Sequence, residues 1–293
     1  MSAPAGGRTA DRQRLVDLGD EVFAVVNGDG GMGLSNSTVL LDGGRAVVID
    51  TMLLPRMNAP VRKELQRRNA TAGLVVNTHQ HVDHMGGNGA FPEARAVAPA
   101  EAARALGLMA QDTSFLPRLM PAFASELAGL ELRLPEPVDP HTLPLPHGAE
   151  ARVFRNAHSI VDLAVWLPRQ RVLVAGDLCF HGVTPLAVHG SISGWIGALD
   201  RLIALDPAVV VPGHGEVTGP EALHALRDYL KGLWATARQA ADEGATASDA
   251  AAVARSFDAG TAGGWREPER SALNVRVALG EITGDPLPLG PPR

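Results

Sequence analysis

The chain has 293 residues, of which 45% are hydrophobic and 20% are charged, which excludes a disordered, collagen-like or multi-span membrane protein. A net charge of −6 and an aromatic content of 4% provide neither a basic surface nor a stacking platform, so we expect no nucleic-acid partner. The single cysteine, Cys179, excludes an internal disulfide, and residues 1–14 lack a signal-peptide stretch; we therefore expect a cytoplasmic protein without membrane contact.

The N-terminal part predicts a β-meander followed by α/β alternation. Short apolar or β-branched runs separated by Gly, Asp and Asn predict antiparallel strands at 22–26, 37–41 and 46–49. Between the first two lies a loop at 27–33 with four glycines and one large apolar side chain, Met32, which could act as a flap. A helix at 60–69 and a buried strand at 73–77 follow.

Residues 111–134 interrupt this alternation after a strand at 94–98 and a helix at 99–107. The interrupting segment carries Phe115, Met120 and Phe123 at roughly helical spacing. Two interpretations are open: an amphipathic helix packed on the body, or a lid whose Met and Phe side chains face a substrate.

The second half repeats the order of strands followed by helix. Strands are predicted at 151–156, 163–168 and 171–175, then a helix at 195–205, a strand at 208–211 and a helix at 220–243, with tail helices at 248–257 and 267–282. No low-complexity linker separates the halves. We expect one α/β domain over 1–293, an αββα sandwich with a catalytic core at 15–216, a helical insertion at 111–134 and a helical tail at 217–293.

Metal-ligand residues follow several predicted strands. The segment Thr78-His79-Gln80-His81-Val82-Asp83-His84 follows the strand at 73–77, and alternation in an extended turn would bring residues 79, 81 and 83 to one point. Imidazoles combined with carboxylates favour zinc or iron over calcium or magnesium. The candidate ligands are His79, His81, Asp83, His84, His158, Asp177 and His214.

The order HxHxDH, His, Gly-Asp and Gly-His-Gly resembles the metallo-β-lactamase superfamily over residues 22–216. The resemblance implies one metal on His79, His81 and His158, a second on Asp83, His84 and His214, and Asp177 as the bridge. It also implies that Asp50 orients the ligands, although a strand-to-turn cap is the alternative. We expect two zinc ions, or another first-row transition metal, and a hydrolytic centre with Asp83 and Asp177 as catalytic residues.

Absences narrow the choice among members of the superfamily. Class B β-lactamases replace the aspartate at 177, and the lactonase tyrosine is missing because Tyr229, the only tyrosine, follows His214. Glyoxalase II is closer in its ligands, but the helical tail has no Lys/Arg cluster for glutathione. The non-enzymatic alternative, a zinc-stabilised binding module, does not explain open ligand positions, because structural zinc sites are closed.

Residues 176–215 resemble second-ring cyclases of actinorhodin-type aromatic polyketide pathways, which are described as cyclase and thioesterase in one. The expected substrate is then a thioester, small or bound to an acyl carrier protein, and the alternative is a generic glyoxalase-II-like thioester, ester or lactone hydrolase. Side chains that could line the cleft or transfer protons are Met32, Phe115, Met120, Phe123, Phe180, His181, His189 and Trp195. Core packing or surface exposure is the alternative for each. The oligomeric state is left open.

Overall fold

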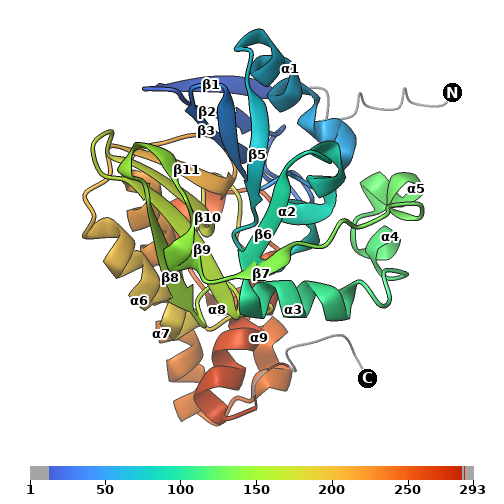
Figure 1. Cartoon of the computed structure of the whole chain (residues 1–293). Helices are drawn as coiled ribbons and strands as arrows, with labels where there is room; N and C mark the ends of the chain where they lie inside the picture. The colour runs from blue at the N-terminus through green and yellow to red at the C-terminus, as the bar shows by residue number, and fades with distance from the viewer. Residues whose placement is uncertain (1–12, 286, 288–293) are drawn as a thin grey trace, which may run out of the picture.

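Two β-sheets face each other, and helices cover both outer faces (Figure 1). The computed structural model describes residues 13–285 and 287. The first sheet contains, in spatial order, β1 (Arg14–Gly19), β2 (Val22–Val26), β3 (Ser37–Asp42), β4 (Arg45–Ile49), β5 (Thr71–Val76), β6 (Arg95–Pro99) and β7 (Glu136–Val138). The second contains β11 (Val209–His214), β10 (Val172–Phe180), β9 (Val161–Leu167) and β8 (Glu150–Arg155). The predicted αββα sandwich is therefore confirmed.

Each sheet begins as an antiparallel meander and continues with parallel strands. In the first sheet β1 to β4 pair antiparallel, whereas β4 to β7 pair parallel. In the second, β8 to β10 pair antiparallel and β11 joins β10 in parallel. Parallel strands end at the same edge of a sheet, so residues that follow β4 and β5 are brought together there.

The core between the sheets follows from side-chain alternation along the strands. On β2, Val22 and Ala24 face the second sheet, while Phe23 and Val25 face the helices outside the first. The inner layer pairs β-branched residues of both sheets, such as Ile49 and Val76 against Val165 and Val174. This layer holds the strand ends at fixed positions.

The helices belong to three groups. The first sheet is flanked by α1 (Ala59–Arg67), α2 (Val82–Met85) and α3 (Ala100–Met109). The second is covered by α6 (Ile192–Ile203) and α7 (Glu221–Asp242), and α8 (Ala250–Ser256) and α9 (Arg270–Thr283) pack beside them. No helix in the described residues is long and apolar enough to cross a bilayer.

The segment at 111–134 is not one helix. It forms two single turns, α4 (Leu116–Leu119) and α5 (Ala124–Leu127), separated by a 3-10 turn at Pro121–Phe123. Proline stands at the start of α4 and again at the 3-10 turn. Each proline removes a helical N–H and disfavours helix before it, which explains why the regular spacing of apolar side chains does not give a continuous helix.

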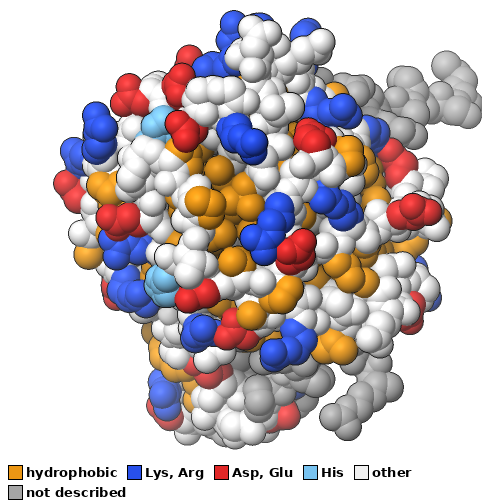
Figure 2. Space-filling view, in the orientation of Figure 1, with side chains coloured by type: hydrophobic (Ala, Val, Ile, Leu, Met, Phe, Trp, Pro, Cys, Tyr) orange, Lys and Arg blue, Asp and Glu red, His pale blue; other side chains and the backbone are white. Residues whose placement is uncertain are grey.

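The face seen in Figure 2 carries no field of a single sign. Lys and Arg side chains alternate with Asp and Glu side chains over this face, and apolar side chains lie between them. Elsewhere in the described residues oppositely charged side chains form ion pairs, for example Arg95 with Glu136 and Arg155 with Glu101. A face of mixed charge does not select one class of charged partner.

Candidate metal centre

The seven candidate ligands come from strand ends and loops at one edge of the sandwich. His79 and His81 follow β5, Asp83 and His84 lie on α2, and His158 lies in the β8–β9 hairpin. Asp177 lies within β10 and His214 ends β11. The structure brings all seven together in two adjoining groups, within each of which the ligand atoms lie within 4.8 Å of one another.

The first group consists of His79, His81, His158 and Asp177. His81 Nδ1 lies 3.0 Å from His79 Nε2 and 3.0 Å from His158 Nε2. Asp177 Oδ2 lies 3.2 Å from His158 Nε2 and 3.6 Å from His79 Nε2. Three ring nitrogens and one carboxylate oxygen therefore converge on one point.

The second group consists of Asp83, His84 and His214, and the other oxygen of Asp177 faces it. Asp177 Oδ1 lies 3.0 Å from His84 Nε2 and 3.6 Å from His214 Nε2. Asp83 Oδ2 lies 3.4 Å from His214 Nε2. The two oxygens of Asp177 thus face different groups, as a bridging carboxylate requires.

Asp83 belongs to this second group, contrary to what alternation along an extended turn suggests. The α2 helix begins at Val82, and His81 before it still has extended backbone angles. The helical turn rotates Asp83 away from His79 and His81 and toward His214. The assignment of ligands to two metals that the resemblance implies agrees with this geometry. The strand-like alternation that groups residues 79, 81 and 83 does not.

The donor set fits a transition metal in each group. His84 Nε2 and Asp177 Oδ1 are both buried and make no hydrogen bond, although they lie 3.0 Å apart. Buried polar atoms without partners are costly, and two of them directed at the same point fit a shared cation. The mixed nitrogen and oxygen donors are those that zinc prefers.

Asp50 connects the two groups from behind. Its Oδ2 accepts a hydrogen bond from Thr78 Oγ1 at 2.8 Å and one from His84 Nδ1 at 2.7 Å, while its Oδ1 accepts from the Thr78 backbone N–H at 2.8 Å. Thr78 Oγ1 also contacts His79 Nδ1 at 2.9 Å. Asp50 has a φ of 57°, a strained conformation that such a network can maintain. One carboxylate therefore orients a ligand of each group, which goes beyond a strand-to-turn cap.

The loops that carry the other ligands are also fixed. His214 Nδ1 donates to the carbonyl of Gly30, in the glycine loop, at 2.9 Å. A Cβ at Gly213 would lie 1.9 Å from Asp177 Oδ1, so only glycine fits before His214. Asp162 accepts from the Ser159 N–H and hydroxyl at 2.9 and 2.8 Å, which holds the turn that carries His158. Sequence reasoning missed Thr78, Gly30 and Asp162; only Thr78, which adjoins His79, offered a local signal.

The protonation tendencies differ between the groups. Burial lowers the pKa of His79 and of His81, so both rings are neutral and each offers a bare nitrogen that can bind a metal. Burial also acts to lower the pKa of His84, but the carboxylates of Asp177 and Asp50 outweigh it and raise that pKa above its usual value. Burial acts in the opposite direction on Asp83 and Asp177, where neighbouring imidazoles outweigh it and hold both pKa values low.

Half of the eight side chains expected at the cleft lie behind the metal ligands or under the glycine loop. Phe180 stacks on His214 with ring centroids 5.0 Å apart, and Trp195 packs on His158 at 4.9 Å; both are buried. Met120 and Phe123 are buried against Gly33. The partly exposed members of the set are Met32, Phe115, His181 and His189.

Two histidines of the β10–α6 loop have different surroundings. His181 Nδ1 contacts the carbonyl of Glu216 at 3.0 Å, and its backbone N–H donates to the carbonyl of the ligand His214 at 3.0 Å. His189 Nδ1 lies 2.8 Å from Nε2 of the ligand His81. Burial lowers the pKa of His189.

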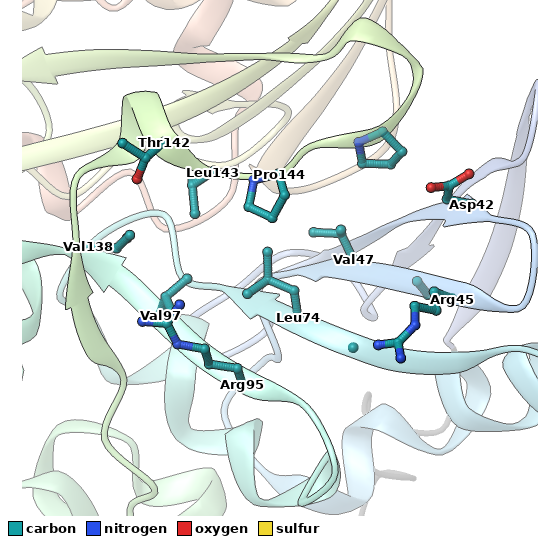
Figure 3. Close-up of a pocket in the computed structure, with 13 residues that line it drawn as sticks. Asp42, Arg45, Val47, Leu74, Arg95, Val97, Val138, Thr142, Leu143 and Pro144 are labelled. Carbon is teal, nitrogen blue, oxygen red and sulfur yellow. The ribbon is translucent and has the colours of Figure 1, made fainter.

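A cavity of about 430 Å³ lies at the other end of the first sheet (Figure 3). It is lined by Val47, Leu74 and Val97, within β4 to β6, with Arg45 and Arg95, the first residues of β4 and β6, beside them. None of the candidate ligands lines this cavity, and His79 and His81 follow the opposite end of β5, so the cavity is separate from the metal centre.

Comparison with known proteins agrees with this geometry. Residues 30–214, more than half of the chain, match the family described as the metallo-beta-lactamase superfamily. The chain belongs to this superfamily. Its members are generally hydrolases, and the His/Asp groups described above are able to bind metal ions.

Relatives of this superfamily member resemble it in sequence or in fold. A hydroxyacylglutathione hydrolase from Synechococcus sp. (strain CC9605) is 29% identical over 180 residues, which span 58% of this chain and 61% of that protein. The sec-alkylsulfatase Pisa1 from Pseudomonas sp. has a TM-score of 0.68 at 17% identity, over 94% of this chain and 51% of that one. A metallo-β-lactamase from Pontibacter korlensis has a TM-score of 0.58 at 18% identity, over 75% and 99%. At these identities the two structures support the fold alone.

Proposed function

We propose that this superfamily member is a two-zinc thioester hydrolase. The observation that carries the proposal is Asp177, whose two oxygens face two separate groups of ligands. Zinc ions held there would supply a hydroxide at neutral pH and polarise the acyl carbonyl. Structural zinc sites hold one ion with four protein ligands of its own, whereas here the two groups of three ligands share the carboxylate of Asp177.

The residues of the chain have separate tasks in this reaction. Water adds to the acyl carbon, the carbon–sulfur bond breaks, and the thiol leaves with a proton. Asp83 is the carboxylate at the accessible side of the centre, with 15% of its side chain exposed. Burial acts to raise the pKa of Asp83, but the imidazoles of His214 and His84 outweigh it and hold the pKa low, so the group is ionised and can orient the attacking water as a hydrogen-bond acceptor. His81 is half-buried, and the remaining five ligands are buried away from bulk water.

One observation favours a thioester, and a second bears on the thiol that carries the acyl group. The hydroxyacylglutathione hydrolase relative supports this expectation, because its name describes cleavage of an acyl group from glutathione. The tail of this chain nevertheless uses its arginines internally: Arg266 pairs with Asp29, Arg270 with Glu267 and Arg276 with Asp285. We therefore propose a thiol carrier other than glutathione.

For the acyl part we propose a poly-β-ketone bound to an acyl carrier protein, with an intramolecular aldol condensation before release. The likeness of residues 176–215 to second-ring cyclases supports this proposal, as does the apolar segment at 111–134. Met120 and Phe123 of that segment pack on the glycine loop whose Gly30 holds His214. A substrate that must fold before it is hydrolysed needs such water-excluding surroundings.

A substrate panel tests the hydrolase proposal. We expect purified zinc-loaded protein to hydrolyse acyl thioesters at least about tenfold faster, in kcat/KM, than β-lactams or acyl-homoserine lactones, because Asp177 is the bridging aspartate rather than a lactamase cysteine or serine. Faster turnover of β-lactams would contradict the proposal. Faster turnover of oxygen esters or lactones would favour the generic ester or lactone hydrolase.

Product analysis tests the cyclase step separately. Replacing Met120 or Phe123 by Ala should change the ratio of cyclised to merely hydrolysed product from a bulky poly-β-ketone thioester, while metal content stays constant. An unchanged ratio in both variants would reject the cyclase and retain the hydrolase.

A further inference from the structure

Each neutral ligand histidine carries one N–H, on the ring nitrogen that does not face the metal, and this N–H needs a hydrogen-bond acceptor. A neutral imidazole has one bare nitrogen and one N–H, so the partner of the N–H decides which nitrogen is free to bind. His79, His84 and His214 direct Nε2 at the centre. Their Nδ1 atoms face Thr78 Oγ1, Asp50 Oδ2 and the Gly30 carbonyl at 2.9, 2.7 and 2.9 Å.

His81 has the opposite orientation. Its Nδ1 faces the centre, 3.0 Å from the Nε2 atoms of His79 and His158. A ligand nitrogen must be bare, so the proton of His81 sits on Nε2. That N–H faces Nδ1 of His189 at 2.8 Å, across 108 residues of sequence.

We propose that His189 is a positioning residue for the first metal: its bare Nδ1 accepts the Nε2–H of His81 and thereby fixes His81 with Nδ1 toward the ion. His189 accepts the N–H of a ligand histidine in the first group, as Asp50 and the Gly30 carbonyl do in the second. Its own proton then sits on Nε2. This role of His189 differs from the two that the sequence leaves open, which are proton transfer to substrate and simple surface exposure.

The chain on both sides of His189 is anchored, as a positioning residue requires. The Ala187 N–H donates to Asn274 Oδ1 at 3.0 Å, and Asn274 Nδ2 donates to the Pro185 carbonyl at 2.9 Å. The Ser191 N–H donates to the Ala157 carbonyl at 2.9 Å, next to the ligand His158. The loop is therefore fixed to α9 on one side and to the β8–β9 hairpin on the other.

Metal binding by full-length variants tests the proposal without any substrate, so its outcome is independent of the proposed thioesterase. His189→Leu removes the acceptor and should weaken one of the two zinc affinities about 10–100-fold in chelator competition. His189→Asn, whose carbonyl oxygen can accept the same N–H, should retain most of that affinity. Val188→Ala, in the same loop, is the matched control and should bind as the wild type. Unchanged binding by His189→Leu, or an equal loss in His189→Asn, would overturn the proposal.

A spectroscopic readout on the unaltered protein guards against misfolded variants. Long-range ¹H–¹⁵N NMR of the zinc-loaded wild type reports which imidazole nitrogen carries the proton. We expect His81 protonated at Nε2 and His189 also at Nε2. A His189 ring protonated at Nδ1, or doubly protonated, could not accept the bond and would reject the proposal.

Discussion

The two ligand groups share Asp177 but are supported differently. In the first group the outer contacts are made by side chains, Thr78 and His189, and His158 Nδ1 is buried without a partner. In the second, His84 is held by a carboxylate and His214 by a backbone carbonyl in a glycine loop. The first group therefore depends on neutral hydrogen bonds and ring packing, whereas the second depends on charge and on the position of one loop.

Asp50→Asn should have the largest effect because it removes the support common to both groups. The amide would place an NH₂ group against two donors, Thr78 Oγ1–H and His84 Nδ1–H, or lose its bond to the Thr78 N–H. We expect both zinc affinities to fall about 10–100-fold in chelator competition. Asp42→Asn, exposed at the end of β3, is the control. Loss of only one ion would show that Asp50 does not link the groups.

Gly30→Ala should weaken metal binding mainly at the second group. Gly30 has a φ of +74°, and a Cβ there would lie 2.3 Å from the Gly215 nitrogen, so the loop must shift and its carbonyl must leave His214. We expect about a tenfold loss of one zinc affinity and a smaller loss of the other. Gly19→Ala is a matched control, because Gly19 has a φ of +78° with nothing within 4 Å of the added Cβ. Equal losses at both ions would contradict the separation of the groups.

Acidification should release the ion of the second group before that of the first. The loss of zinc should be gradual as the pH falls, and smaller than the loss caused by the two substitutions. The raised pKa of His84 means that a proton competes with the metal for this histidine at higher pH than at His79 and His81, whose pKa values are lowered. Zinc content measured after dialysis at stepwise lower pH should fall from two ions to one before it falls to none. Release of both zinc ions over the same pH range would contradict the expectation that protons compete more strongly for the second group.

The sequence predicted the layers and the ligands better than it predicted their neighbours. Strands with buried apolar runs, such as β2 and β4, lie where the sequence predicts them. The edge strand β1 was missed because most of its residues are exposed or only half-buried, and β7 because it has three residues and contains a proline. The strand predicted at 171–175 extends to Phe180 as β10, because Gly176 with its positive φ bends the strand without ending it.

Contacts between distant segments account for what the sequence could not show. Nothing local to His189 distinguishes it from His181, because its partner lies 108 residues earlier in the chain. For Trp195 the sequence leaves both the cleft and core packing open, and the structure places it in the core with its indole N–H donating to the Leu178 carbonyl at 3.0 Å. A strand-end ligand can be inferred from one segment, whereas the residue that orients it needs the packing of two.

The shared carboxylate of Asp50 has a thermodynamic consequence for metal loading. A single oxygen, Oδ2, contacts both Thr78, which orients His79, and His84. The first ion to bind orders these hydrogen-bonded side chains. The second ion then loses less conformational entropy on binding, so the two binding equilibria are coupled. Linkage makes the coupling reciprocal: each ion changes the affinity of the other by the same factor, whichever binds first.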